Sequence, residues 1–298
     1  MLRRQKQNIH QIKNKFLIRY GLNFIIKLSI AIPDSSLSDE KTLENKTRKI
    51  ASIARSCGIF RVNEIIIYLD GKRNENDSKL LLTILRYLET PQYFRRDVFG
   101  KTNLLKFAGI LPPLKIPNQT GTSNPKELKK NDAREAMIVR IKGKKGIDVG
   151  INQIINYHSK HDVGKRIIVQ IKNAFPDFSV KEITKDEING YWSYDVRLAG
   201  SLFSVLSNWD GIKILTSRKA KRINQSHIDE LKKSEKQVLV VFGSTDKGIH
   251  DILGNKINNL QNSKTINFFP NQGTQTVRIE EAVLGCLSVI NTFGSSNK

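Results

Sequence analysis

The sequence predicts an α/β protein with a largely parallel sheet that is interrupted by a small all-β module. Two observations lead to this fold class. Short apolar runs rich in β-branched residues alternate with helical patterns in the first and last thirds of the chain, and strand–helix–strand units with short links require parallel strands. Between them, a stretch rich in Pro, Gly, Ser and Asn leads into short alternating strands. The 298 residues suffice for one large or two ordinary domains.

The first predicted elements form a βαβ unit. Residues 1–22 read as a basic, partly helical arm, and a buried strand over 23–33 ends at Pro33. A helix follows, with Gly58 as a plausible stop and with an apolar face made of Leu43, Ile50, Ala54 and Cys57. The run "EIIIYLD" is the second strand, and a further helical segment over 78–99 is interrupted at Pro91.

The middle of the chain predicts a separate β module. "GILPPLKIPNQTGTSNPKELKK" has the composition of a linker, and short alternating strands with turn signals follow it. Residues 115–185 hold fifteen basic and seven acidic residues, a net charge of +8. A basic barrel of the OB type would suit single-stranded nucleic acid, and the alternative is a solvated insert without a ligand. The candidate RNA contacts here are Lys144, Lys145, Lys165 and Arg166.

The last third returns to the α/β pattern. Three buried strands, "IKILTSR", "VLVVFGSTDKG" and "TINFFPNQGT", end in small or polar residues, and an apolar helix covers 277–290. Ligands of open parallel sheets bind beyond the carboxyl ends of the strands. These three strand ends are therefore expected to line one crevice, although each glycine taken alone is more often a turn residue than a ligand contact.

Amino-acid composition limits the classes of partner and of site that the protein can have. Fifty Lys and Arg against 28 Asp and Glu leave a net charge of +22 and a pI near 10, which favours a polyanionic partner, nucleic acid before a membrane surface. No run reaches the ~18 apolar residues of a membrane span, and no signal peptide is seen, so we expect a cytoplasmic protein. The five histidines lack zinc-site spacing, which predicts no metal, and Cys57 and Cys286 are expected to be buried thiols.

Three common catalytic motifs are absent from the sequence. "GSTDKGIH" begins like a phosphate loop, but Ile249 and His250 stand where Lys and Ser or Thr are required. No G-x-G-x-x-G follows the first strand, and no G-x-S-x-G elbow occurs. The sequence therefore does not predict an NTPase, a Rossmann nucleotide site or an α/β hydrolase.

Several segments together resemble the SPOUT superfamily of RNA methyltransferases, in its archaeal and eukaryotic branch of RNA uridine-N3 methyltransferases. They span about residues 24–290 and include "LSIAIPDSSL", "KIASIARSCGIFRVNEIIIYLD", "LRYLETPQYFRR", "FAGILPPL", "GYWSYDVRLAGSL", "LVVFGSTDKG" and "FPNQGTQTVRIEEAVL". The resemblance implies a C-terminal trefoil knot, S-adenosylmethionine as cofactor, RNA (rRNA in particular) as partner, and a homodimer. It divides the chain into an arm (1–22), a methyltransferase domain (23–114 and 186–298) and an OB-like RNA-binding insert (115–185).

The resemblance also assigns roles to residues of this chain. The expected cofactor-binding residues lie in three loops and are Thr216, Ser217, Arg218, Phe242, Gly243, Ser244, Asn267, Phe268, Pro270, Gln272, Gly273, Thr274 and Thr276. Two departures from the family pattern put local contacts in doubt: the missing glycine after Arg218, and Thr245 where relatives often carry proline.

Other residues are candidates for proton transfer and for orienting the RNA. Asp34, after the first strand, and Glu281, in the last helix, are candidate proton acceptors, and Glu281 has the equal alternative of stabilising its helix dipole. Arg55, Arg61 and Arg278 are candidates for orienting RNA. Methylation at a guanine or a ribose 2'-hydroxyl, or a non-catalytic role in ribosome assembly, remain alternatives.

Overall fold

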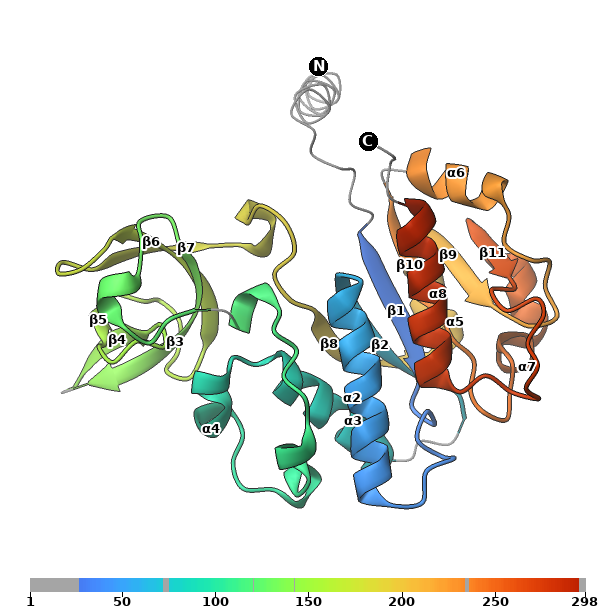
Figure 1. Cartoon of the computed structure of the whole chain (residues 1–298), viewed down its shortest axis with the longest axis horizontal. Coiled ribbons are helices and arrows are strands. Elements are labelled where there is room, and N and C mark those ends of the chain that lie inside the picture. Colours follow the sequence, from blue (N-terminus) through green and yellow to red (C-terminus); the bar gives the residue numbers. More distant parts are fainter. Residues whose placement is uncertain (1–26, 72–74, 120, 142, 234–235, 295–298) are drawn as a thin grey trace.

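A computed structural model describes residues 27–71, 75–119, 121–141, 143–233 and 236–294 (Figure 1). The predicted basic arm, 1–22, and the first residues of the predicted strand at 23–33 lie outside the described residues. The described chain forms a six-stranded sheet and a five-stranded sheet, which lie beside each other in Figure 1.

The six-stranded sheet is parallel throughout, which confirms the predicted α/β class with a parallel sheet. Its strand order is β11-β9-β10-β1-β2-β8, and all five neighbouring pairs are parallel. All six residues of β1 are buried, as expected for a central strand covered on both faces. The strands are β1 (Leu28–Pro33), β2 (Val62–Leu69), β8 (Asp195–Ser201), β9 (Gly211–Thr216), β10 (Gln237–Val241) and β11 (Ser263–Ile266).

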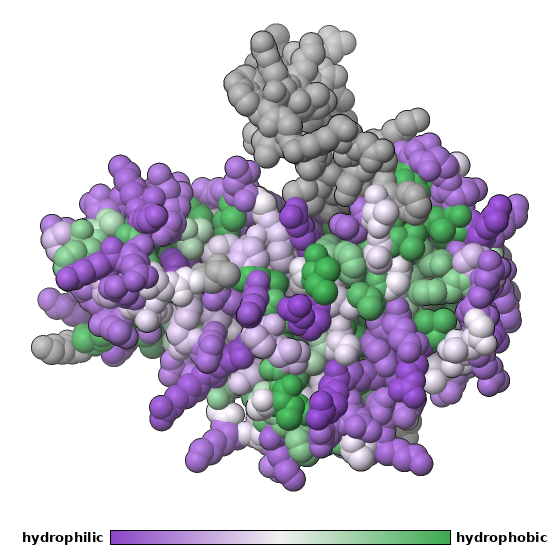
Figure 2. Space-filling view, in the orientation of Figure 1, coloured by the Kyte–Doolittle hydropathy of each residue, from purple (hydrophilic) through white to green (hydrophobic). Residues whose placement is uncertain are grey.

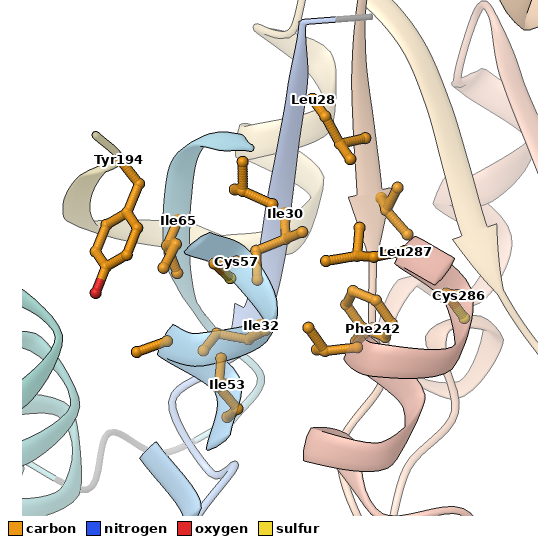
Figure 3. Packing of buried hydrophobic residues seen from close by; sticks show 14 of the residues in the cluster. Leu28, Ile30, Ile32, Ile53, Cys57, Ile65, Tyr194, Phe242, Cys286 and Leu287 are labelled. Carbon is orange, nitrogen blue, oxygen red and sulfur yellow. The ribbon is translucent and has the colours of Figure 1, made fainter. Parts of the chain in front are cut away.

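Helices cover both faces of this sheet. One core contains residues of α2 (Leu43–Ile59), α3 (Glu75–Glu89), α6 (Gln225–Lys233) and α8 (Ile279–Gly294). The core of the opposite face contains residues of α5 (Leu202–Ser207) and α7 (Ile249–Leu253). Figure 3 shows how Ile30 and Ile32 of β1 lie between Ile53 of α2 and Leu287 of α8. The result is a three-layer α/β/α arrangement.

Local sequence signals explain the helix boundaries. The Thr42 side chain accepts a hydrogen bond from the Asn45 backbone N–H and so begins α2. This helix continues to Ile59, one residue past the expected glycine stop. The predicted break at Pro91 is confirmed, because α3 ends at Glu89. A short 3-10 turn (Gln92–Phe94) and α4 (Arg95–Val98) follow.

The described residues of the predicted linker, 109–130, contain no long helix or strand. They include the end of a 3-10 turn at Ala108–Ile110 and the turns at Pro117–Gln119 and Pro125–Glu127, and a further turn at Asn103–Leu105 precedes them. The chain then forms five antiparallel strands, which we call the β module: β3 (Ala133–Ile141), β4 (Lys144–Asp148), β5 (Ile155–Asn156), β6 (Arg166–Asn173) and β7 (Ser179–Ile183). It has a core of its own that includes Ile138, Ile147 and Val169. After a 3-10 turn at Lys185–Glu187, β8 rejoins the first sheet beside β2.

Arg166 connects the β module to the end of α3. Its guanidinium lies 3.1 Å from carboxylate oxygens of both Glu89 and Glu135, and it also donates to the Thr90 hydroxyl. Trp192 Nε1, on the returning chain, donates to Glu135 as well. Burial raises the pKa of Glu135, and the Arg166 charge opposes that increase. The charges thus compensate one another inside the junction between the two sheets.

Candidate functional site

A pocket of about 490 Å³ lies at the carboxyl ends of β9, β10 and β11, together with the start of α8. This volume falls in the range of small-molecule sites. Ten of the predicted cofactor residues line it: Thr216, Ser217, Arg218, Phe242, Gly243, Ser244, Asn267, Phe268, Gln272 and Thr276. The structure therefore brings the three predicted strand ends together, as the parallel order of the strands requires.

Asn267 holds two of the pocket loops against each other. Its side-chain amide donates to the Arg218 carbonyl at 2.9 Å, and its backbone N–H donates to the Lys221 carbonyl, also at 2.9 Å. The Asn267 carbonyl in turn accepts from the Ile223 N–H, and its side-chain oxygen accepts from the Phe269 N–H. Asn267 thus has a clear structural task at the wall of the pocket.

The loop after β10 makes a close turn. The Ser244 N–H donates to the Lys247 carbonyl at 2.9 Å, and the Ser244 hydroxyl accepts from the Lys247 N–H. A Cβ atom on Gly243 would lie 3.0 Å from that same carbonyl, which is tighter than an ordinary contact. Glycine is therefore favoured at this wall of the pocket because the backbone approaches closely.

The loop between β11 and α8 only partly faces the pocket. Arg218 donates to the Gln275 carbonyl at 2.9 Å, and Gln272 donates to the Thr274 carbonyl. These bonds hold the loop against itself and against the loop that follows β9. Three residues predicted to bind cofactor are not among the lining residues: Pro270, Gly273 and Thr274. A Cβ atom on Gly273 would have no neighbour within 4 Å, so this glycine borders open space.

Neither candidate proton acceptor lines the pocket. Asp34 is buried and accepts from the Ser78 hydroxyl and the Asp70 backbone N–H. Its burial, and then its hydrogen bond to the Asp70 carboxyl, raise its pKa. Glu281 accepts from the Arg278 backbone N–H at 2.9 Å at the start of α8. This geometry favours the alternative that Glu281 stabilises its helix.

Asp39 is a pocket carboxylate that the sequence argument missed. It lies in the same loop as Asp34 but lines the pocket. Lys49, which is almost fully buried, holds both carboxylate oxygens of Asp39 at 2.5 and 2.6 Å and also approaches Glu280 of α8 at 3.3 Å. Lys49 gave little indication of this pairing in the sequence, because lysines in helices are mostly exposed.

The candidate RNA residues fall into three places. Arg278 lines the pocket, and its guanidinium pairs with Glu40 at 3.2 Å. Arg55 and Arg61 lie at the other end of the sheet, beside the start of β2. The remaining four belong to the β module, where Lys144 and Lys165 are exposed, Lys145 donates to the Ser159 and His161 carbonyls, and Arg166 forms the junction described above. The geometry of Arg166 favours a structural role over RNA contact.

The two cysteines do not form a disulfide, and Cys286 lines the pocket. Cys57 and Cys286 are buried free thiols, and burial raises the pKa of both. Among the described residues, no group of three His, Cys, Asp or Glu side chains is arranged to hold a metal ion. In the same part of the chain, every helix is too short or too polar to cross a membrane.

A polar pocket at the carboxyl edge of a parallel α/β sheet is the place where enzymes of this architecture bind their ligands. Residues 27–290 match the model of a protein family described as "Putative RNA methyltransferase". The chain belongs to this family, so it is a member of a family of RNA methyltransferases, as the resemblance predicted.

Relatives with printed activities cover most of the chain. A mouse protein named 28S rRNA (uridine-N(3))-methyltransferase is 30% identical over 300 residues, which covers 88% of this chain and 75% of the mouse protein. The human protein of the same name is 28% identical, over 88% of this chain and 77% of the human protein. A Drosophila melanogaster protein of that name is 27% identical, over 88% of this chain and 61% of the fly protein.

Proposed function

We propose that this protein transfers a methyl group from S-adenosylmethionine to N3 of a uridine in ribosomal RNA. The observation that carries the proposal is the meeting of three polar strand ends in one pocket of about 490 Å³, in a chain of an RNA methyltransferase family. The names of the mouse, human and fly relatives support uridine N3 as the acceptor atom.

The pocket lining fits the proposed cofactor. Phe242, Phe268 and Ile279 offer apolar walls for an adenine ring, and the polar loops around them offer donors and acceptors for its edge. Asp246 and Arg218 offer charges for the amino-acid end. When bound, S-adenosylmethionine supplies an electrophilic methyl group.

The residues of the chain would contribute position and proton transfer. Loops held by Asn267 and Arg218 would align the uracil ring with the cofactor, and alignment of this kind supplies much of a rate enhancement. The N3 proton must leave, and Asp39 is the carboxylate that we propose accepts it, with Lys49 fixing its orientation. Arg278 would orient the RNA at the same wall.

The knot is part of the same proposal, as is membership of the SPOUT superfamily. The segment at Asn267 is hydrogen-bonded on both sides to the loop that contains Lys221 and Ile223, and Arg222 forms a β-bridge with Asn267. This pairing between a loop and a much later segment supports a trefoil knot. True knots are rare in proteins, so the arrangement would be specific to the fold.

We further propose that the chain divides into the arm, methyltransferase domain and insert defined above, and that the β module is an OB-like RNA-binding insert. Its antiparallel strands, its separate core and the exposed Lys144 and Lys165 support this. A homodimer is proposed as well, supported by Leu284 of α8, whose side chain is 47% exposed on a helix that otherwise packs into the core. An rRNA substrate supports a place of action inside the cell, and we propose the cytoplasm.

Two matched glycine variants test the pocket. Gly243→Val should remove S-adenosylmethionine binding in calorimetry, because the new side chain crowds the Lys247 carbonyl at the pocket wall. Gly273→Val should bind like the parent, since its Cβ meets open space outside the lining. Thermal melting checks that both variants fold. Equal binding by the two variants would place the cofactor elsewhere.

Nucleoside mass spectrometry on the same proteins tests the acceptor atom. Ribosomal RNA incubated with the parent and S-adenosylmethionine should gain 3-methyluridine, and RNA incubated with Gly243→Val should not. A methylguanosine or 2'-O-methyl product would keep the cofactor assignment but replace the proposed acceptor. A parent that neither binds cofactor nor modifies RNA would instead favour a role in ribosome assembly without catalysis.

A further inference from the structure

A second cavity lies at the opposite edge of the six-stranded sheet from the cofactor pocket. It has a volume of about 550 Å³, and we call it the junction cleft. It is lined by the end of α2, the chain that leaves for the β module and the chain that returns from it, and its lining includes Arg55, Ile59, Arg61, Lys115 and Tyr191. The Asn118 N–H donates to the Trp192 carbonyl and joins the two crossing segments next to the cleft.

The charge of the junction cleft has one sign. Arg55, Arg61 and Lys115 line it, and no acidic side chain is among its described lining residues. None of these three cations forms an ion pair with a carboxylate of the described chain. Arg55 donates to the Pro113 and Leu114 carbonyls, which hold it at the wall, whereas Arg61 and Lys115 are exposed. Such a cavity attracts an anion.

The backbone at two of the cleft's cations is unusual for their residue types. Arg61 and Lys115 both have φ in the left-handed region, at 56° and 53°. Such conformations are uncommon for residues other than glycine and gather at functional sites.

The cleft also offers apolar contact. Ile59 is 54% exposed at its edge, and the ring of Tyr191 belongs to its wall. In Figure 2, hydrophilic residues dominate the visible surface of the β module, and hydrophobic residues reach the surface around α2 and α8. Cations beside aromatic and apolar side chains are the combination that binds single-stranded nucleic acid, through phosphates and base faces respectively.

We propose that the junction cleft binds a nucleotide of single-stranded RNA outside the methyl-transfer pocket, with Arg61 and Lys115 on phosphates and the apolar wall at Ile59 and Tyr191 against the base. The proposal rests on the proposed function in that it takes RNA as the substrate. It adds a site that would hold the RNA between the α/β layers and the β module. The six residues of β1 span about 20 Å, so the RNA must extend well beyond the reacting uridine to occupy both sites.

Salt dependence of RNA binding tests the two cations. A fluorescein-labelled oligouridylate is titrated with the full chain across a salt series, with Arg61→Gln, Lys115→Gln and Lys256→Gln as variants. Each phosphate contact on a single strand contributes about 0.7 to the slope of log K against log salt. Arg61→Gln and Lys115→Gln should each lower the slope by about that amount. Lys256 lies over the Phe203 ring on the other face of the sheet, so its variant should keep the parent slope.

The outcomes separate this inference from the proposed function. S-adenosylmethionine binding by the Arg61 and Lys115 variants should equal that of the parent, which also shows that they are folded. A parent that binds oligouridylate, with cleft variants that match Lys256→Gln in slope and affinity, would overturn the junction cleft and leave the proposed function standing. A parent that binds no oligouridylate at any salt concentration would overturn both.

Discussion

At the scale of single residues, two carboxyl groups of one loop have different surroundings. Asp34 is buried against Ser78 and Asp70, whereas Asp39 lines the pocket at the strand ends and is held by Lys49. Both follow the same strand, and nothing in their side-chain chemistry separates them. The loop path over the sheet edge decides which carboxylate meets a ligand.

The raised pKa of Asp34 gives a pH-dependent prediction. Burial first, and then the hydrogen bond to Asp70, raise it above its ordinary value of 3.8, so the folded protein binds this proton more tightly than the unfolded chain does. Stability from this group is fully present below about pH 3.8 and is lost as the pH rises through the folded-state pKa. Asp34→Asn lacks this loss.

Urea unfolding of the parent and Asp34→Asn across pH checks this. The free energy of unfolding of the variant, relative to the parent, should increase as the pH rises above 3.8 and become constant once Asp34 is ionised in the folded parent. Ser35→Ala, which loses its hydrogen bond to Asp70, serves as a control for a simple loss of contact in the same loop. A difference between Asp34→Asn and the parent that is independent of pH would contradict the argument.

At the scale of secondary-structure elements, the strand ends were the most informative part of the sequence. Parallel pairing sends the carboxyl ends of β9, β10 and β11 to one edge, so ten of thirteen predicted residues line one pocket. Pro270, Gly273 and Thr274 do not, because hydrogen bonds of Arg218 and Gln272 to the loop backbone determine which part of the loop faces inward. A residue pattern alone does not contain that hydrogen-bond pattern.

At the junction between α3 and β6, Arg166 is expected to stabilise the fold. Arg166→Met would leave Glu89 and the buried Glu135 without their cation, and breaking a buried ion pair in this way destabilises a protein by about 3–5 kcal/mol. Lys165→Met changes the neighbouring exposed residue and should alter stability by no more than about 0.5 kcal/mol. Guanidinium unfolding followed by circular dichroism measures both. Equal stability of the two variants would show that the ion pairs of Arg166 do not contribute to the stability of the fold.

At the scale of the whole molecule, the chain combines a parallel α/β/α unit with an antiparallel β module and carries a net charge of +22. The two cavities described above lie at opposite edges of the six-stranded sheet. An RNA substrate would therefore contact the molecule over a long path, and the excess of cations suits such a path.

The exposed Leu284 of α8 predicts that two copies of the chain associate through this helix. The parent should sediment as a dimer, and Leu284→Glu should sediment as a monomer because it places a charge on the exposed part of α8. Val163→Glu is the matched control, since Val163 is also 47% exposed but lies in the turn before β6, and it should remain a dimer. A monomeric parent, or a dimeric Leu284→Glu variant, would remove this face from the proposed dimer.

Side-chain periodicity and backbone chemistry are local in the chain, and they predicted the alternation of strands and helices, the break at Pro91 and the polar ends of three strands. They did not predict that Asp39 rather than Asp34 reaches the pocket, that Arg166 closes an internal junction, or that Arg61, Lys115 and Tyr191 share a cleft. Each of these depends on segments far apart in sequence meeting at a sheet edge, and that meeting is set by strand order and packing.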